Sequence, residues 1–144
     1  LAFLLSFTSL PSAVVIICSP FLSLINLFLL APEVVISILN SSKGIILETF
    51  GSGNATTDNW FINELKSAIQ KGKIIINVSQ CLSGSVNQGH YQTSKQLEAI
   101  GVISGKDMTT EAALTKLMFL LGTNLENSII KIKVTENLAG ELTI

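Results

Sequence analysis

Two runs of aliphatic residues, at positions 44–47 and 73–78, place the tightest limit on how this chain can fold. The second run is an almost unbroken series of Ile and Val, without the alternation of apolar and polar residues that marks a strand with one wet face. Such runs are typical of strands covered on both faces, as in parallel sheets. Segments with the apolar spacing of helices separate and follow them. This order predicts βαβ units, and therefore an α/β fold in which helices flank a small parallel sheet.

Capping residues and apolar spacing predict five helices after the first 31 residues. Gly72 is expected to close one of them in a left-handed conformation. Thr109 or Thr110 is expected to cap another. Thr123 and Glu126 have the S/T-x-x-E spacing of a capping box, which predicts a further helix start at Thr123. The predicted helices cover residues 32–40, 58–71, 93–100, 110–121 and 123–133.

Residues 1–31 differ from the rest of the chain, because no Asp, Glu, Lys or Arg occurs before Glu33. The window 13–31 is long enough to cross a bilayer, which takes roughly 20 mostly apolar residues. Pro20 and three polar residues interrupt that window, and no basic residue flanks it. The alternative is a buried strand at 14–18 or 24–28. We favour the strand and expect no membrane span, with residues 32–144 forming an α/β domain distinct from this apolar segment.

The charged and sulfur-containing residues restrict the classes of partner and of chemistry. Charged residues make up 13% of the chain, about half the roughly 25% usual in a soluble domain. All nine basic residues are lysines and the net charge is −1, so no nucleic-acid partner is expected. Cys18 and Cys81 form no C-x-x-C pair, and His90 is the single histidine. This argues against redox and zinc chemistry and suits a reducing compartment.

Two segments have the composition of a ligand site at the carboxyl ends of the predicted strands. Residues 48–55 and 79–89 are both rich in Gly, Ser, Asn and Gln, and ligands of open parallel sheets bind beyond these strand ends. The segments could hold a small polar ligand or be ordinary turns, and composition alone favours turns. Gly51-Ser52-Gly53 begins like a dinucleotide-binding fingerprint, but Thr56 stands where the third glycine belongs.

Four side chains near these segments allow two interpretations each. Cys81 could act as a nucleophile activated by His90, but a small buried apolar residue is the more common role of a cysteine. We therefore expect Cys81 to be buried and His90 to be a loop residue. Trp60 and Phe61, at the start of a predicted helix, are expected to anchor the core or, alternatively, to cover a subunit interface.

Five segments resemble bacterial type I L-asparaginases, the cytoplasmic form, in order and at the family's spacing. They read LETFGSGNA at 47–55, INVSQC at 76–81, SGSVNQG at 83–89, GVISGKDMTTEA at 101–112 and NLAGELT at 137–143. The resemblance runs from about Pro32 to Thr143. It implies the smaller, C-terminal domain of the enzyme, a parallel four-stranded sheet flanked by helices, and a cytoplasmic location.

The resemblance also implies an activity that this chain does not complete alone. The family hydrolyses L-asparagine to L-aspartate and ammonia through a threonine nucleophile, assisted by a second threonine with a lysine and an aspartate. These residues belong to motifs of the larger N-terminal domain, and neither motif occurs here. We therefore expect no catalytic residue in the chain, no cofactor, no metal, and no activity from the chain by itself. Leu1, in place of a methionine, suggests a piece of a longer protein.

The resemblance carries further roles onto four positions. Asn54 matches the residue that reaches the active site of a neighbouring subunit, which implies a homo-oligomer, a dimer or a tetramer. Cys81 matches a position near a second, regulatory asparagine site of some type I enzymes, and Glu48 stands where some relatives have an arginine in that site. Ala139 departs from the usual Leu-Arg-Gly-Glu-Leu ending and removes an arginine contact.

Residues 1–31 match the family poorly, which a frameshifted or mistranslated upstream stretch or a real insertion would explain. Two other classes of function stay open at this point. One is a non-catalytic module that binds asparagine or a similar small amino acid. The other is an interaction module that residues 1–31 anchor in a membrane.

Overall fold

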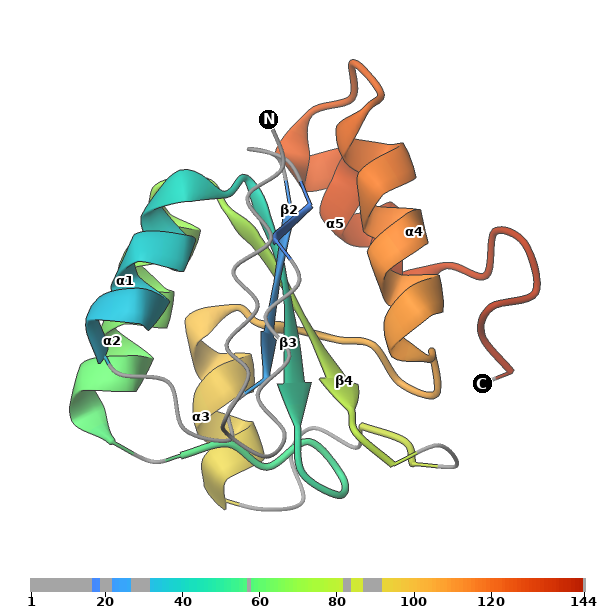
Figure 1. Cartoon of the computed structure of the whole chain (residues 1–144). Helices are drawn as coiled ribbons and strands as arrows, with labels where there is room; N and C mark the ends of the chain where they lie inside the picture. Colours follow the sequence, from blue (N-terminus) through green and yellow to red (C-terminus); the bar gives the residue numbers. More distant parts are fainter. Residues whose placement is uncertain are drawn as a thin grey trace.

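The computed structural model describes residues 17–18, 22–26, 32–56, 58–81, 84–86 and 92–143. Over these residues the chain forms one five-stranded sheet, with its strands in sequence order, and five helices (Figure 1). The strands are β1 (Ile17–Cys18), β2 (Leu22–Asn26), β3 (Gly44–Thr49), β4 (Ile74–Ser79) and β5 (Ile103–Ser104). The helices are α1 (Pro32–Ser41), α2 (Asn59–Gln70), α3 (Gln92–Ile100), α4 (Thr110–Leu121) and α5 (Asn127–Thr135).

The sheet confirms the predicted α/β class. β2, β3, β4 and β5 pair in parallel, and the two-residue β1 is antiparallel to β2. β3 and β4 lie next to each other, and every residue of the two strands is buried except the half-buried Glu48. Strands covered on both faces need apolar side chains in both directions. This is the physical reason for the aliphatic runs at 44–47 and 73–78.

Helices cover both faces of the sheet, and the sheet divides the core into two layers (Figure 1). On one face, Ile45 of β3 and Phe61 of α2 belong to a buried cluster that also includes residues of α1 and α3. On the other face, Ile46 of β3 shares a second cluster with Leu117 of α4 and Ile130 of α5. Successive residues of a strand point to opposite faces. Neighbouring isoleucines therefore serve different layers.

The aromatic pair at the start of α2 confirms the expected core role. Phe61 is fully buried in the cluster on the α1–α3 face, and the half-buried Trp60 packs against the same cluster. Their rings meet edge to face, with centroids 5.7 Å apart and an interplanar angle of 74°. Such a geometry is favoured for aromatic pairs. The pair anchors α2 on the sheet.

Two of the predicted helix ends are confirmed by their cap geometry. Gly72, just past the end of α2, has a φ of +85°, which a residue with a Cβ atom rarely adopts. At the other end of the fold, Thr109 caps α4, because its hydroxyl oxygen accepts the backbone N–H of Ala112 at 3.2 Å. Of the two candidates, Thr109 is therefore the capping residue.

The predicted capping box at 123–126 is wrong. α5 begins four residues later than expected, at Asn127, and its N-cap residue Glu126 makes no side-chain capping bond. The Thr123 hydroxyl donates instead to the carbonyl of Leu120, at the end of α4, at 2.5 Å. Threonine hydroxyls often bond to a carbonyl three residues back. Here that bond belongs to the preceding helix.

Two short strands lie in the apolar first segment. β1 and β2 overlap the predicted ranges 14–18 and 24–28, and β2 runs beside β3 from Leu22↔Gly44 to Asn26↔Glu48. In the part of the chain that the structure describes, no helix has the length and apolar character needed to cross a membrane. The division of the chain after residue 31 stays a prediction.

Candidate functional site at the carboxyl edge of the sheet

The chain makes a tight turn directly after β3, over residues 50–54, which we call turn 50–54. The backbone N–H groups of Gly53 and Asn54 both donate to the Phe50 carbonyl, at 3.1 and 2.9 Å, and the Phe50 N–H donates to the Asn54 carbonyl at 3.0 Å. Gly51 and Gly53 have φ values of +52° and +103°. The glycines of Gly51-Ser52-Gly53 therefore serve a left-handed turn, which favours glycine for steric reasons.

Polar side chains of β4 hold this turn against the sheet. The Asn77 side-chain amide donates to the Gly53 carbonyl at 3.2 Å, and the Ser79 hydroxyl donates to the Gly51 carbonyl at 2.5 Å. The Thr49 hydroxyl, at the end of β3, donates to Asn77 Oδ1 at 2.7 Å. Thr49 and Asn77 are fully buried. The ends of β3 and β4, which lie at the same edge of the sheet in Figure 1, are thus joined by side chains as well as by the strand ladder.

The loop after β4 closes over the same turn. A Cβ atom added to Gly53 would lie 2.7 Å from Cγ1 of Val86, so the glycine packs directly against this valine. Val86 is itself fixed to the end of β5, because its N–H donates to the Lys106 carbonyl at 2.8 Å and its carbonyl accepts the Ser104 hydroxyl at 2.7 Å. The described residues of both segments that the sequence singled out, 48–55 and 79–89, therefore contribute to one edge of the sheet.

The structure places the three candidate site residues differently. Asn54 lies at the end of turn 50–54, half-buried. Glu48 lies within β3 instead of in the loop after it, and it accepts a hydrogen bond from the Thr110 hydroxyl, at the start of α4, at 2.8 Å. Cys81 lies beyond the end of β4, where its backbone N–H donates to the Ser79 hydroxyl at 3.1 Å.

The expectation that Cys81 is buried is wrong, because its side chain is exposed. β4, whose residues are all buried, ends two residues earlier, at Ser79, so Cys81 is not part of this buried strand. The suggested partner, His90, lies outside the described residues, so the pairing of the two stays a prediction. Among the residues that the structure describes, no group of three His, Cys, Asp or Glu side chains could hold a metal ion.

Sequence reasoning missed Thr49, Asn77 and Ser79, the side chains that organise the edge. One signal could have identified Asn77: it interrupts a strand that is otherwise aliphatic from Ile74 to Val78. An amide in a fully buried strand needs hydrogen-bond partners, because burial without them costs free energy. The partners come from turn 50–54 and from β3, which the sequence alone does not bring together.

The C-terminal segment 137–143 is held to the fold by ionic contacts. Lys116 of α4, nearly fully buried, lies 2.5 Å from Glu141 and also donates to the Glu136 carbonyl. Glu141 further accepts the N–H groups of Leu138 and Ala139, at 3.0 and 2.6 Å. The Lys116 ammonium, followed by these backbone donors, lowers the pKa of Glu141 to about 2. Ala139 thus contributes its backbone to the Glu141 contact.

A second carboxylate, that of Asp107, holds the last residues through hydrogen bonds. Asp107, in the loop before α4, accepts hydrogen bonds from both the hydroxyl and the N–H of Thr143. The hydroxyl of Thr143 is the main reason that the pKa of Asp107 is lowered. Because Glu141 and Asp107 both hold this segment, the terminal motif is part of the folded domain.

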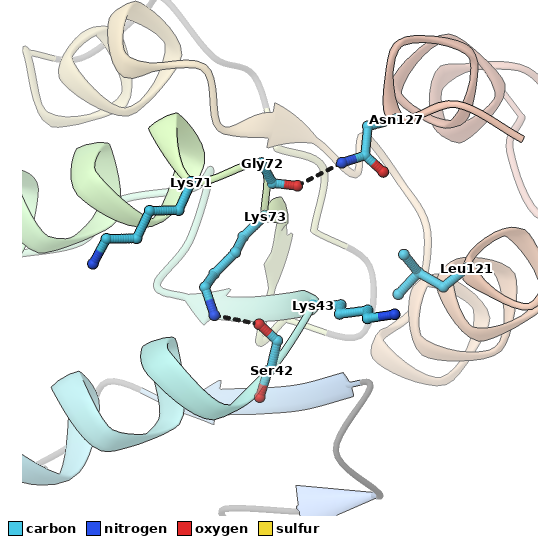
Figure 2. Close-up of a pocket in the computed structure, with 7 residues that line it drawn as sticks. All are labelled: Ser42, Lys43, Lys71, Gly72, Lys73, Leu121 and Asn127. Atoms are coloured by element: carbon cyan, nitrogen blue, oxygen red, sulfur yellow. Dashed lines mark hydrogen bonds between the residues drawn. The ribbon is translucent and has the colours of Figure 1, made fainter.

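A cavity of about 330 Å³ lies at the opposite edge of the sheet, at the amino ends of β3 and β4 (Figure 2). It is lined by Ser42, Lys43, Lys71, Gly72, Lys73, Leu121 and Asn127. The Lys73 amine donates to the Ser42 carbonyl at 2.6 Å, whereas the amines of Lys43 and Lys71 point to opposite sides in Figure 2. Burial, and then the charge of Lys71, lower the pKa of Lys73. The three ammonium groups therefore do not converge on one point of the cavity (Figure 2).

Comparisons with known proteins match the described domain to one group. Residues 25–132 match the model of the glutaminase/asparaginase C-terminal domain. L-asparaginase 1 of Escherichia coli K12 is 46% identical over 101 residues, which are 70% of this chain and 30% of that protein. The human 60 kDa lysophospholipase is 43% identical over 102 residues, 70% of this chain and 18% of that protein. The crystal structure of L-asparaginase I from Vibrio cholerae superposes with a TM-score of 0.77 at 41% identity, covering 87% of this chain and 38% of that one.

Proposed function

Because this chain belongs to the glutaminase/asparaginase C-terminal domain family, we propose that it is the C-terminal domain of an L-asparaginase. The resemblance to type I L-asparaginases drawn from the sequence motifs is confirmed by these relatives. The chain spans less than a third of the length of the curated relatives described above. The reaction we assign to the whole protein is hydrolysis of L-asparagine to L-aspartate and ammonia.

The observation that carries this proposal is the ordered carboxyl edge. Turn 50–54, with Asn54 at its end, lies inside the matched region and is held by buried side chains of β4. A rigid loop at the end of parallel strands is where open α/β sheets present polar groups to ligands. An amide side chain carries both a donor and an acceptor, so it suits the polar groups of asparagine.

The division of labour within the enzyme follows from the same proposal. The threonine nucleophile belongs to the larger domain, and this chain contributes Asn54 to the active site of a neighbouring subunit. The enzyme is therefore a homo-oligomer, a dimer or a tetramer, in the cytoplasm. Support comes from the half-buried position of Asn54, at the sheet edge and outside both apolar core clusters.

The proposal includes a second, regulatory asparagine site near Cys81 and Glu48. Cys81 is exposed and close to the ordered edge, as a residue beside a ligand would be. Glu48 stands where some relatives have an arginine, whose positive charge would attract the carboxylate of asparagine. The Glu48 carboxylate instead repels that group, because like charges repel, and it already accepts a hydrogen bond from Thr110. We therefore propose that any second asparagine site binds weakly in this protein.

The experiment that tests the function compares the protein encoded by the complete coding region with the 144-residue chain. Ammonia release from L-asparagine is measured for both, with a lysophospholipid as a second substrate because one relative is named a lysophospholipase. We expect the complete protein to hydrolyse asparagine and the chain alone to be inactive. Hydrolysis by the chain alone would contradict the location of the nucleophile. A complete protein that binds asparagine without hydrolysing it would instead be an amino-acid-binding module.

The assignment of Asn54 is tested by Asn54→Ala in the complete protein. Loss of a buried hydrogen bond to the substrate costs about 1–3 kcal/mol, so kcat/KM should fall roughly five- to 150-fold. Ser52→Ala, in the same turn, is the matched control and should leave kcat/KM within about twofold. Equal values for Asn54→Ala and the unmodified enzyme would show that Asn54 does not contact the substrate.

A further inference from the structure

We propose that Asn77 is a positioning residue: its buried side-chain amide fixes turn 50–54 and thereby sets where Asn54 stands in the active site. Asn77 itself lies in β4, inside the fold, and does not reach the substrate. The inference rests on the proposed function, because it assigns Asn77 a role in the reaction through Asn54. It goes beyond that function by naming the side chain on which the site geometry depends.

Packing alone does not call for an amide at position 77. Its neighbour on the same face of β4, Ile75, and its partner on β3, Leu47, are buried aliphatic residues, and its partner on β5 is the half-buried Ser104. A buried amide is costly unless its polar atoms find partners. Asn77 is completely buried and finds them at both ends of its amide group. The amide therefore serves to form these two hydrogen bonds, one to β3 and one to the turn.

The partners of the Asn77 amide fix its direction. The Gly53 carbonyl can only accept a hydrogen bond, so the group 3.2 Å from it is the donor Nδ2. The Oδ1 atom then faces β3, where it accepts the Thr49 hydroxyl at 2.7 Å. The Thr49 hydroxyl also lies 3.2 Å from the Val78 carbonyl, which fixes its own position. Thr49 thus orients Asn77, and Asn77 orients the peptide that follows Gly53.

β4 holds the turn directly beside Asn54. Asn77 and Ser79 lie on the same face of β4, and each holds one glycine carbonyl of the turn. A Cβ atom added to Gly51 would meet nothing within 4 Å, whereas one added to Gly53 would meet both Val86 Cγ1 at 2.7 Å and Asn77 Nδ2 at 3.1 Å. Because Asn54 follows Gly53 directly, a shift of this peptide moves Asn54.

The experiment measures steady-state kinetics of the complete protein with Asn77→Asp. This change keeps the oxygen that accepts from Thr49 and replaces the donor toward Gly53 with a second oxygen, which repels the carbonyl. We expect KM for asparagine to rise roughly tenfold while kcat changes less than about threefold, as for a lost binding interaction. A merely structural role would lower kcat with the folded fraction and leave KM unchanged.

Two further variants keep the test decisive if Asn77→Asp folds poorly. Thr49→Val removes the hydroxyl that orients the amide, and we expect KM to rise about threefold or more. Thr49→Ser retains the hydroxyl and should restore KM to the value of the unmodified enzyme. Ile75→Val, on the same face of the same strand, lowers stability without touching the turn and should leave KM unchanged.

A double-mutant cycle decides whether Asn77 acts through Asn54. If it does, Asn77→Asp in an Asn54→Ala background should leave KM within about twofold of the Asn54→Ala value. Independent, multiplying effects on KM would overturn the inference, as would an unchanged KM in folded Asn77→Asp and Thr49→Val. An unmodified protein that does not hydrolyse asparagine would overturn the proposed function first and this inference with it.

Discussion

Gly53 shows at the scale of one residue how little space the ordered edge leaves. Its φ of +103° lies where residues with a side chain are strained, and an added Cβ atom would lie 2.7 Å from Val86 and 3.1 Å from Asn77 Nδ2. Gly51, two residues earlier in the same turn, has a φ of +52° and open space around it. The two glycines therefore meet different requirements: conformation alone at Gly51, and conformation with close packing at Gly53.

This difference predicts unequal effects of substitution. Gly53→Ala should lower the free energy of unfolding by about 1–3 kcal/mol through overpacking, with a further loss from backbone strain. Gly51→Asn is the matched control and should cost less, because Asn tolerates the left-handed region. Urea-induced unfolding of both variants provides the comparison. An equal loss at the two positions would show that Val86 moves aside.

Glu141 carries the second prediction at this scale, a dependence of stability on pH. The pKa of Glu141 falls from its ordinary value of 4.5 to about 2 in the fold, mainly through Lys116. Because the folded form keeps this carboxylate ionised, its stabilising effect is complete above about pH 4.5 and is lost as the pH falls toward 2.

Glu141→Gln should therefore be less stable than the unmodified protein at neutral pH, by about 1–3 kcal/mol. The difference should shrink as the pH falls from 4.5 to 2. Glu136→Gln is the control, since the exposed Glu136 side chain pairs with Lys133 at 3.7 Å and such pairs contribute little. Unfolding by guanidinium at several pH values measures both. A difference that stays constant down to pH 2 would contradict the shifted pKa.

At the scale of the element, the two threonines proposed as caps show why a capping pattern alone is ambiguous. Thr109 and Thr123 both precede a helix, but only the Thr109 oxygen accepts a backbone N–H of the helix that follows. The Thr123 hydroxyl donates a hydrogen bond to the carbonyl of Leu120, at the end of α4. A hydroxyl can satisfy the end of one helix or the start of the next. The choice depends on where the backbone leaves α4.

The cap of α4 leads to a prediction on helix stability. Thr109→Ala removes the hydroxyl that accepts from Ala112 and should lower the free energy of unfolding by about 1 kcal/mol. Thr109→Ser keeps the capping oxygen and should cost much less. Thermal unfolding followed by circular dichroism compares the two. If both variants lost the same amount, the threonine methyl group and not the cap would be responsible.

At the scale of the whole molecule, the sheet separates two apolar layers, which have no side chain in common among the described residues. Ile38 of α1 belongs to the layer on one face, and Ile130 of α5 belongs to the layer on the other. Both side chains are almost completely buried, with exposed fractions of 4% and 2%. A change in one layer therefore reaches the other through the sheet.

This separation predicts additive effects. Ile38→Val and Ile130→Val should each lower the free energy of unfolding by about 0.5–1.5 kcal/mol, because each leaves a small cavity. The double variant should lose the sum of the two, to within about 0.5 kcal/mol. Urea titrations of the three variants measure the additivity. A large coupling energy would mean that strain passes through the sheet.

Local patterns in the sequence predict most of the elements and the class of the protein. The aliphatic runs of β3 and β4, the glycine after α2 and the motifs shared with L-asparaginases are all visible in the printed residues. Local signals suffice here because strands buried on both faces need apolar residues throughout, and helix ends need particular residue types. The same reasoning predicted that segments 48–55 and 79–89 follow the carboxyl ends of these strands.

Which side chains meet at this edge depends on how distant parts of the chain pack together. Asn77 bonds the carbonyl of Gly53, 24 residues away, and Thr110 bonds Glu48, 62 residues away. Such contacts depend on which strands pair, in which register, and on where each helix crosses the sheet. A local pattern records that a residue is polar, but the partner of that residue is chosen by packing across the whole chain. For this reason the segments of the site were predictable, while the hydrogen-bond partners of the side chains that hold it were not.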